Sequence, residues 1–186
     1  HRDIKPMNLY APPGRPDQAR VFDLGVARDV SGTMTSGGIP GTLDYMAPEF
    51  AEADADRGSP RSDLYSLGLC LYEALVGQTA FPRLPPEINS SWPQFQERAR
   101  TRPAIDFRAR VFLKYPDLAN VVRKAIEFDP RHRYAGAAAM RQDLENVLRR
   151  LDKPEAIPPA EDVGTLAVVT PREPPVIPPP APAPEA

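Results

Sequence analysis

The sequence predicts a mainly helical domain with a small β-ribbon at one edge. Three stretches after Ser62 repeat apolar residues at helical spacing, whereas strand-like residues are confined to positions before Asp23. The chain holds 25 prolines, and they are densest from Asp152 onward, where they oppose regular structure. We therefore expect a folded domain over 1–151 and a Pro/Ala-rich linker or disordered tail over 152–186.

The β-ribbon is expected near the start of the chain. Leu9-Tyr10 and Arg20-Val21-Phe22 are strand-like, and a turn rich in proline and glycine separates them at 11–18. Two short strands around such a turn are typical of a hairpin.

The first helix is expected over 63–76. These residues are apolar nearly all round, which indicates a helix buried on most of its faces. Ser62 is the expected N-terminal cap, and Gly77 suits the left-handed conformation that ends a helix.

Further helices are expected beyond position 90. Two are indicated by apolar residues at helical spacing, first at 118, 121, 122, 125 and 126, then at 140, 144, 147, 148 and 151. A shorter helix is predicted near 92–102. The arginines at 98, 100, 102, 108 and 110 are interpreted as a solvated face, with a basic docking patch as the alternative.

Composition excludes several classes of protein. The formal charge of −2 provides no field for binding nucleic acid or an anionic membrane. Cys70 is the only cysteine, which excludes an internal disulfide and suits a reducing, cytoplasmic compartment. The longest apolar run, in 64–76, is too short to span a bilayer. Because the first residue is His1 and not methionine, we expect the natural N-terminus to lie upstream.

The first eight residues, His-Arg-Asp-Ile-Lys-Pro-Met-Asn, combine groups suited to phosphate chemistry. The Asp3 carboxylate could accept a proton or align a hydroxyl group. Lys5 could neutralise a phosphate oxygen, and the Asn8 amide oxygen could coordinate a hard cation such as Mg²⁺. Without further context, the segment would be a polar loop before a strand.

Two more motifs lie downstream. Asp23-Leu24-Gly25 comes directly after the second strand, where a carboxylate followed by glycine can be presented to a metal through a tight turn, although such turns are common. Further along lie Gly41-Thr-Leu-Asp-Tyr-Met-Ala-Pro-Glu49 and Asp129-Pro-Arg-His-Arg133.

In this order, the motifs resemble those of the protein kinase family, in its eukaryotic-type Ser/Thr branch, which includes bacterial members. The first matches the catalytic loop H-R-D-x-K-P-x-N, and the second matches D-F-G with Leu24 in place of phenylalanine. The resemblance covers 1–151 and implies the C-terminal lobe of a two-lobed α+β fold, starting inside the catalytic loop.

The resemblance implies roles for the loop residues. Asp3 would be the catalytic base that orients the substrate hydroxyl, Lys5 would contact the γ-phosphate of ATP, and Asn8 would hold one metal ion. Arg2 would pair with a phosphate on the activation loop. Asp23 would bind the Mg²⁺ (or Mn²⁺) that bridges the β- and γ-phosphates.

Other residues would bind the nucleotide or support the fold. Tyr10 falls where the family usually has an aliphatic residue beneath the adenine ring, and an aromatic ring could still form the floor of that pocket. Glu49 and Arg133 would form a buried ion pair. Asp63, at the start of the buried helix, would accept hydrogen bonds from the main chain near His1 and Arg2.

The segment between the second and third motifs is the expected activation loop. Thr33 and Thr35 are the candidate autophosphorylation sites, and a phosphate there could pair with Arg2 and order the loop. The alternative is a hydroxyl-rich loop without this role. Thr42 resembles the threonine that contacts Asp3 and Lys5 and marks Ser/Thr specificity.

The expected reaction transfers the γ-phosphoryl group of ATP to Ser or Thr hydroxyls of protein substrates. Its partners would be ATP, these proteins and a second copy for trans-autophosphorylation, but no nucleic acid. The phosphate-binding glycine loop and the strand lysine precede His1 in the family, so we expect this chain alone to be inactive. A membrane span is conceivable only elsewhere in the parent protein. The alternatives are a pseudokinase or scaffold, and a small-molecule phosphotransferase of related fold.

Overall fold

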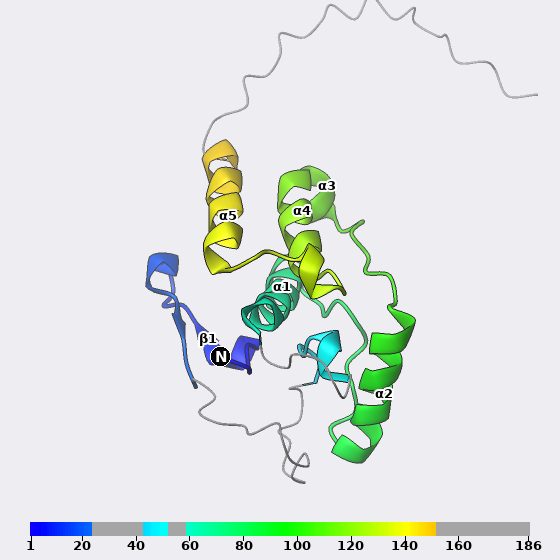
Figure 1. Cartoon of the computed structure of the whole chain (residues 1–186). Coiled ribbons are helices and arrows are strands. Elements are labelled where there is room, and N and C mark those ends of the chain that lie inside the picture. Colours follow the sequence, from blue (N-terminus) through cyan, green and yellow to red (C-terminus); the bar gives the residue numbers. More distant parts are fainter. Residues whose placement is uncertain (24–42, 52–58, 152–186) are drawn as a thin grey trace, which may run out of the picture. The chain divides into compact units, whose positions relative to one another are not determined.

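A computed structural model of the protein describes residues 1–23, 43–51 and 59–151. Within these ranges the chain forms five α-helices and a two-stranded antiparallel sheet (Figure 1). A mainly helical fold with a small β-ribbon is what the sequence predicts. The strands are β1 (Leu9–Tyr10) and β2 (Arg20–Val21), paired with Leu9 opposite Val21. The helices are α1 (Pro60–Val76), α2 (Ile88–Thr101), α3 (Arg110–Lys114), α4 (Pro116–Ala125) and α5 (Ala137–Leu151).

Helix α1 begins earlier than the sequence predicts. Ser59 is the capping residue and Pro60 opens the first turn, where a missing N–H and a fixed φ favour helix initiation. The prediction that Ser62 caps the helix is therefore wrong, since Ser62 lies inside the first turn. Gly77 ends the helix in the left-handed conformation, with φ of 81°, as expected.

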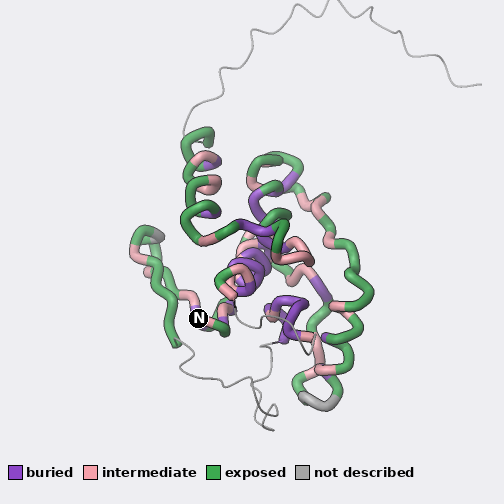
Figure 2. The backbone as a smooth tube through the Cα atoms, viewed as in Figure 1, coloured by how far each residue is buried: buried purple, intermediate pink, exposed green. Residues whose placement is uncertain are grey.

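The packing of α1 against α4 depends on a glycine. A Cβ atom at Gly68 would lie 2.6 Å from Ile126 Cγ2 and 2.8 Å from Ala125 Cβ, well inside van der Waals contact. The absence of a side chain thus allows the two helices to approach each other closely. Along α1, buried positions dominate (Figure 2).

Two apolar clusters meet around α1. One side of the helix packs against the loop after it and against α2, α3 and α4, with buried members that include Tyr65, Leu69, Tyr72, Phe81, Phe95, Phe112 and Val122. The other side packs against α4 and α5 through Leu64, Val121, Ala125, Tyr134, Met140 and Val147. Helix α1 is therefore the centre of the fold.

Two elements differ from the sequence-based expectation. Helix α2 starts at Ile88, four residues before the predicted start, and it packs on a 3₁₀ turn, η3 (Pro48–Ala51). Helix α3 was not predicted, because five residues are too few to show a helical period and only Phe112 among them is buried. No helix in the described ranges has the length and apolarity needed to cross a membrane.

Candidate active site

Asp3, Lys5 and Asn8 lie together in a buried cluster. A 3₁₀ turn, η1 (Pro6–Asn8), folds the chain back so that the Asn8 amide nitrogen donates to the Asp3 main-chain oxygen at 2.8 Å. The same nitrogen lies 3.3 Å from Asp3 Oδ2, and Lys5 Nζ lies 2.9 Å from that oxygen. All three residues are less than one-tenth exposed, at 7%, 6% and 7%. Two donors therefore hold one oxygen of the Asp3 carboxylate.

The other Asp3 oxygen, Oδ1, is buried and has no hydrogen-bond partner in the described part of the chain. A buried acceptor without a donor costs roughly 1–3 kcal/mol, so such atoms are rare and commonly belong to reactive sites. With Oδ2 held by Lys5 and Asn8, Oδ1 is the oxygen of Asp3 with capacity to accept a further hydrogen bond.

The β-ribbon brings the main chain just before Asp23 into contact with Asn8. The Phe22 N–H donates to the Asn8 main-chain oxygen at 2.8 Å, so Asp23 comes directly after a contact with Asn8. Asp23 adopts a φ of 55°, which is uncommon for a residue with a side chain and marks a sharp turn at the end of the ribbon. Leu24 and Gly25, the rest of this motif, lie outside the described residues.

The donor set of this corner fits a hard cation. The Asn8 amide nitrogen donates to Asp3, which directs the amide oxygen of Asn8 away from Asp3. The carboxylate of Asp23, one residue after the main-chain contact with Asn8, is the second candidate ligand. No group of three or more His, Cys, Asp or Glu residues suited to a metal occurs in the described ranges. Two oxygen ligands suit Mg²⁺, which usually keeps water and substrate phosphates as its other ligands.

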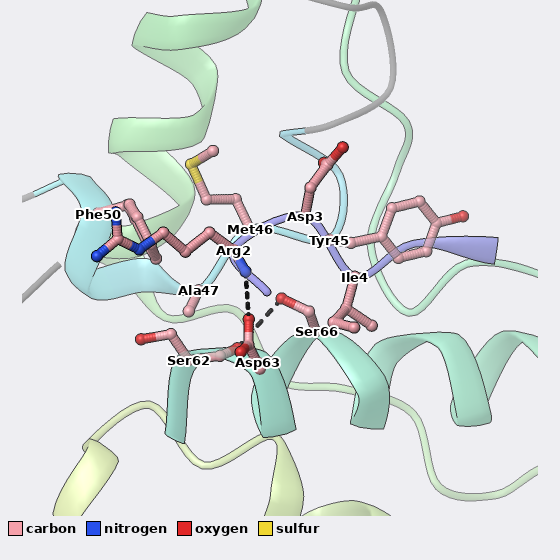
Figure 3. A pocket seen from close by; sticks show the side chains of 10 residues that line it. All are labelled: Arg2, Asp3, Ile4, Tyr45, Met46, Ala47, Phe50, Ser62, Asp63 and Ser66. Carbon is pink, nitrogen blue, oxygen red and sulfur yellow. Dashed lines mark hydrogen bonds between the residues drawn. The ribbon is translucent and has the colours of Figure 1, made fainter. Parts of the chain in front are cut away.

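Helix α1 anchors the loop from below. The main-chain nitrogens of His1 and Arg2 each lie 2.8 Å from an oxygen of the Asp63 carboxylate. Figure 3 shows the contact of Arg2. Arg2 has a φ of 66°, a strained conformation that these two contacts help to hold. In Figure 3, the side chains of Asp3 and Asp63 lie on opposite sides of the loop. Asp63 therefore positions the loop without facing the same side as Asp3.

Residues 45–47 pack beside the loop. Together with Asp3 and Asp63, they line a recess of about 10 Å³, which has room for about one water molecule (Figure 3).

A network of charged side chains fixes residues 44 and 45. The Tyr45 hydroxyl donates to Glu73 on α1, and Arg83 bridges Glu73 at 2.8 Å and Asp44 at 3.5 Å. Burial, together with the bond to Glu73, raises the pKa of Tyr45 to about 12.

Glu49 and Arg133 form a buried ion pair. Arg133 donates from both terminal nitrogens to the two Glu49 oxygens, each at 2.8 Å. Its remaining N–H groups meet the main-chain oxygens of Glu127, Arg61 and Phe128, at 2.6, 3.2 and 2.9 Å, so all five donors of the guanidinium are used. Ser62 also donates to Glu49, at 2.7 Å. Burial alone would raise the pKa of Glu49, but Arg133 and Ser62 together lower it.

An exposed apolar surface lies on and beside the β-ribbon. Met7 is 82% exposed, and Tyr10 and Phe22 are each 53% exposed with their rings packed edge to face at 6.1 Å. Tyr10 lies on β1, which directly follows η1 and Asn8, and its ring packs against Phe22, the residue before Asp23.

Several predicted site residues cannot be placed. Thr33, Thr35 and Thr42 lie outside the described residues.

The network of Asp44, Glu73 and Arg83 was not predicted from the sequence. A signal for it exists, because Glu73 is a charged residue within a helix that is otherwise apolar nearly all round.

The motifs, their order and the buried Asp3 cluster point to one family. The protein kinase domain family matches residues 1–144, and the chain belongs to this family. It is similar to the serine/threonine-protein kinase PknB of Mycolicibacterium smegmatis, with 34% identity over 90% of this chain and 26% of the relative. PknB of Mycobacterium tuberculosis is 35% identical over 79% of this chain and 22% of its own length.

A third relative comes from outside the mycobacteria. The serine/threonine-protein kinase pkn3 of Myxococcus xanthus is 30% identical over 92% of this chain and 31% of the relative. The chain thus spans about a fifth to a third of the length of these curated relatives.

Proposed function

We propose that residues 1–151 are the C-terminal lobe of a Ser/Thr protein kinase that transfers the γ-phosphoryl group of ATP to protein hydroxyls, and that 152–186 is a linker or tail. The observation that carries this proposal is the Asp3 carboxylate, with Oδ2 held by Lys5 at 2.9 Å and Oδ1 buried without a partner in the described ranges. Such a carboxylate can orient an acceptor hydroxyl and receive its proton.

The neighbouring residues supply the other parts of the reaction. Lys5 lies beside the hydroxyl-binding carboxylate and can neutralise charge on the phosphoryl group during transfer. The Asn8 oxygen and the Asp23 carboxylate would hold Mg²⁺ or Mn²⁺, which would neutralise the phosphate oxygens when bound. Tyr10 would form the floor of the adenine site with its exposed ring.

Regulation is proposed at the segment before Leu43. Phosphorylation of Thr33 or Thr35 by a second copy of the enzyme would create a partner for Arg2, whose main chain is already fixed by Asp63. Thr42 would contact Asp3 and Lys5 and select Ser or Thr acceptors. A cytoplasmic location, with membrane attachment through other parts of the parent protein, suits such an enzyme.

The exposed apolar surface of Met7, Tyr10 and Phe22 is the observation that supports a second lobe, which would cover it. An apolar surface next to a site is usually covered in the working protein. We therefore propose that this chain needs a nucleotide-binding lobe in order to hold ATP and turn over. No described feature favours a pseudokinase or a small-molecule phosphotransferase.

The test compares Asp3→Asn with Asp17→Asn in the full-length protein. Asp17 is the matched control, because its side chain is 64% exposed and pairs with Arg15 on the turn of the ribbon. Asp3→Asn removes the proton acceptor and should lower kcat by roughly 10²–10⁴-fold, the usual contribution of a general base, while Asp17→Asn should not change it. Phosphate transfer from labelled ATP to a protein substrate measures both. Equal activity of the two variants would contradict the proposed role of Asp3.

A further inference from the structure

One arginine on α2 departs from the solvated face that the sequence suggests. Arg100, Arg102, Arg108 and Arg110 are exposed, but Arg98 is half-buried, and its guanidinium lies over the rings of Phe81 and Phe95, 5.0 and 5.4 Å from their centres. Burial lowers the pKa of Arg98, as expected for a cation with little access to water. The interpretation as a solvated face is therefore wrong for Arg98.

The hydrogen bonds of Arg98 are few for a guanidinium with so little access to water. Nη2 donates to the Leu43 main-chain oxygen at 2.6 Å, whereas Nη1 is buried without a partner in the described ranges. A buried donor without an acceptor opposes folding, and an apolar side chain of similar length would avoid this penalty. The two ring contacts and the hydrogen bond to Leu43 have to offset this penalty, and of these only the hydrogen bond fixes a particular main-chain atom.

The contact with Leu43 fixes the start of the segment that runs beside Asp3. The Leu43 oxygen also receives the Met46 N–H at 3.4 Å, so it closes the turn that leads to residues 45–47. Those residues line the recess beside Asp3 (Figure 3). On the other side, Leu43 is bonded to Thr42, the expected specificity residue. Arg98 therefore holds the main chain between these two features.

We propose that Arg98 is a positioning residue, which holds the main chain at Leu43 from α2 and so sets where the acceptor polypeptide lies relative to Asp3. This inference rests on the proposed kinase function. It assigns α2 a part in acceptor binding that acts through one hydrogen bond to the main chain. Asp44 and Tyr45, next to Leu43, are held separately by Arg83 and Glu73, so loss of Arg98 should loosen the segment at its start without detaching it.

The first experiment measures amide hydrogen exchange over 43–50 in the 186-residue chain, which needs no activity. The variants are Arg98→Met, Arg98→Lys and the control Arg100→Met, whose side chain is exposed and pairs with Glu97 on the same helix. Arg98→Met should speed exchange of these amides by about tenfold, the effect expected from losing one charged hydrogen bond. Arg98→Lys keeps a cationic donor and should restore most of the protection, and Arg100→Met should change nothing. Unchanged exchange in Arg98→Met would overturn the proposal.

The second experiment measures kinetics in the full-length protein. Arg98→Met should raise KM for a protein acceptor by about tenfold, with the KM for ATP and the rate of ATP hydrolysis by water unchanged. A fall in all rates together with a lower unfolding midpoint would show a merely structural role and overturn the proposal. An inactive wild-type protein would instead refute the kinase function, and with it the acceptor role, while the exchange data would still decide the contact with Leu43.

Discussion

Breaking the ion pair between Glu49 and Arg133 should cost more stability than breaking any surface pair in the described part of this chain. Its arginine side chain is 0% exposed and its glutamate side chain 9% exposed, so water screens the pair little. Replacing Glu49 by Gln keeps the shape but leaves the Arg133 charge buried beside a neutral amide. Breaking a buried pair in this way costs about 3–5 kcal/mol, a large share of the roughly 5–15 kcal/mol that holds a typical domain together.

The assay is urea unfolding of the whole chain, followed by circular dichroism. The control is Asp106→Asn, which breaks a pair whose arginine and aspartate side chains are 88% and 56% exposed and which should cost at most about 1 kcal/mol. The double variant Glu49→Met with Arg133→Met should lose less than Glu49→Gln, because it leaves no charge unpaired. A loss below about 1 kcal/mol for Glu49→Gln would refute the reasoning.

The same pair predicts how stability depends on acid. The pKa of Glu49 is lower in the folded chain than its ordinary value of 4.5. Its contribution is therefore fully present above that value, and it is lost as the pH falls toward the folded pKa. Glu49→Gln should remove this part of the acid dependence, which unfolding curves at a series of acid pH values would show.

Two further predictions concern packing and alkaline pH. Gly68→Ala should destabilise the chain by about 1–3 kcal/mol, because the new methyl group would overlap Ile126 and Ala125. Gly136→Ala is the control, since nothing lies within 4 Å of a Cβ atom there. Equal unfolding midpoints for the two variants would contradict the close approach of α1 and α4. Burial raises the pKa of both Tyr45 and Tyr65 from the ordinary value of 10 to about 12. The stability that the neutral phenol groups provide is therefore fully present below pH 10, and it is lost as the pH rises toward 12. Unfolding curves between pH 8 and about 11 would test this, and Tyr45→Phe should reduce the slope, whereas a flat profile in the unaltered chain would count against it.

The helices that pack around the core were readable from the sequence because burial imposes a period on apolar residues. The stretch that forms α1, with Leu64, Leu69 and Tyr72 on its buried faces, shows this most clearly. The residues next to a helix start predicted that start less accurately. Pro60 opened α1 ahead of Ser62, and α2 begins four residues before the predicted start, although Pro93 lies inside it.

The site shows a similar division. The positions of Asp3, Lys5 and Asn8 could be read from their spacing because one short loop carries all three. Contacts between distant segments could not be read in the same way. Arg98 and Leu43 are 55 residues apart, and nothing in the residues around either one indicates that a guanidinium would reach that carbonyl oxygen.

Helix α1 also sets a limit on how this chain can change length. Three residues at fixed angular positions on this helix contact three different parts of the chain. Asp63 binds the loop at Arg2, Gly68 makes room for α4, and Glu73 binds Tyr45. Each inserted or deleted residue would rotate everything beyond it by about 100° around the helix axis. A single insertion between Asp63 and Glu73 should thus break contacts at several places at once. The exposed ends of the following loop, at 77–78 and 86–87, could absorb one with local rearrangement. Length variation among natural versions of this domain is therefore expected in that loop and excluded from the helix.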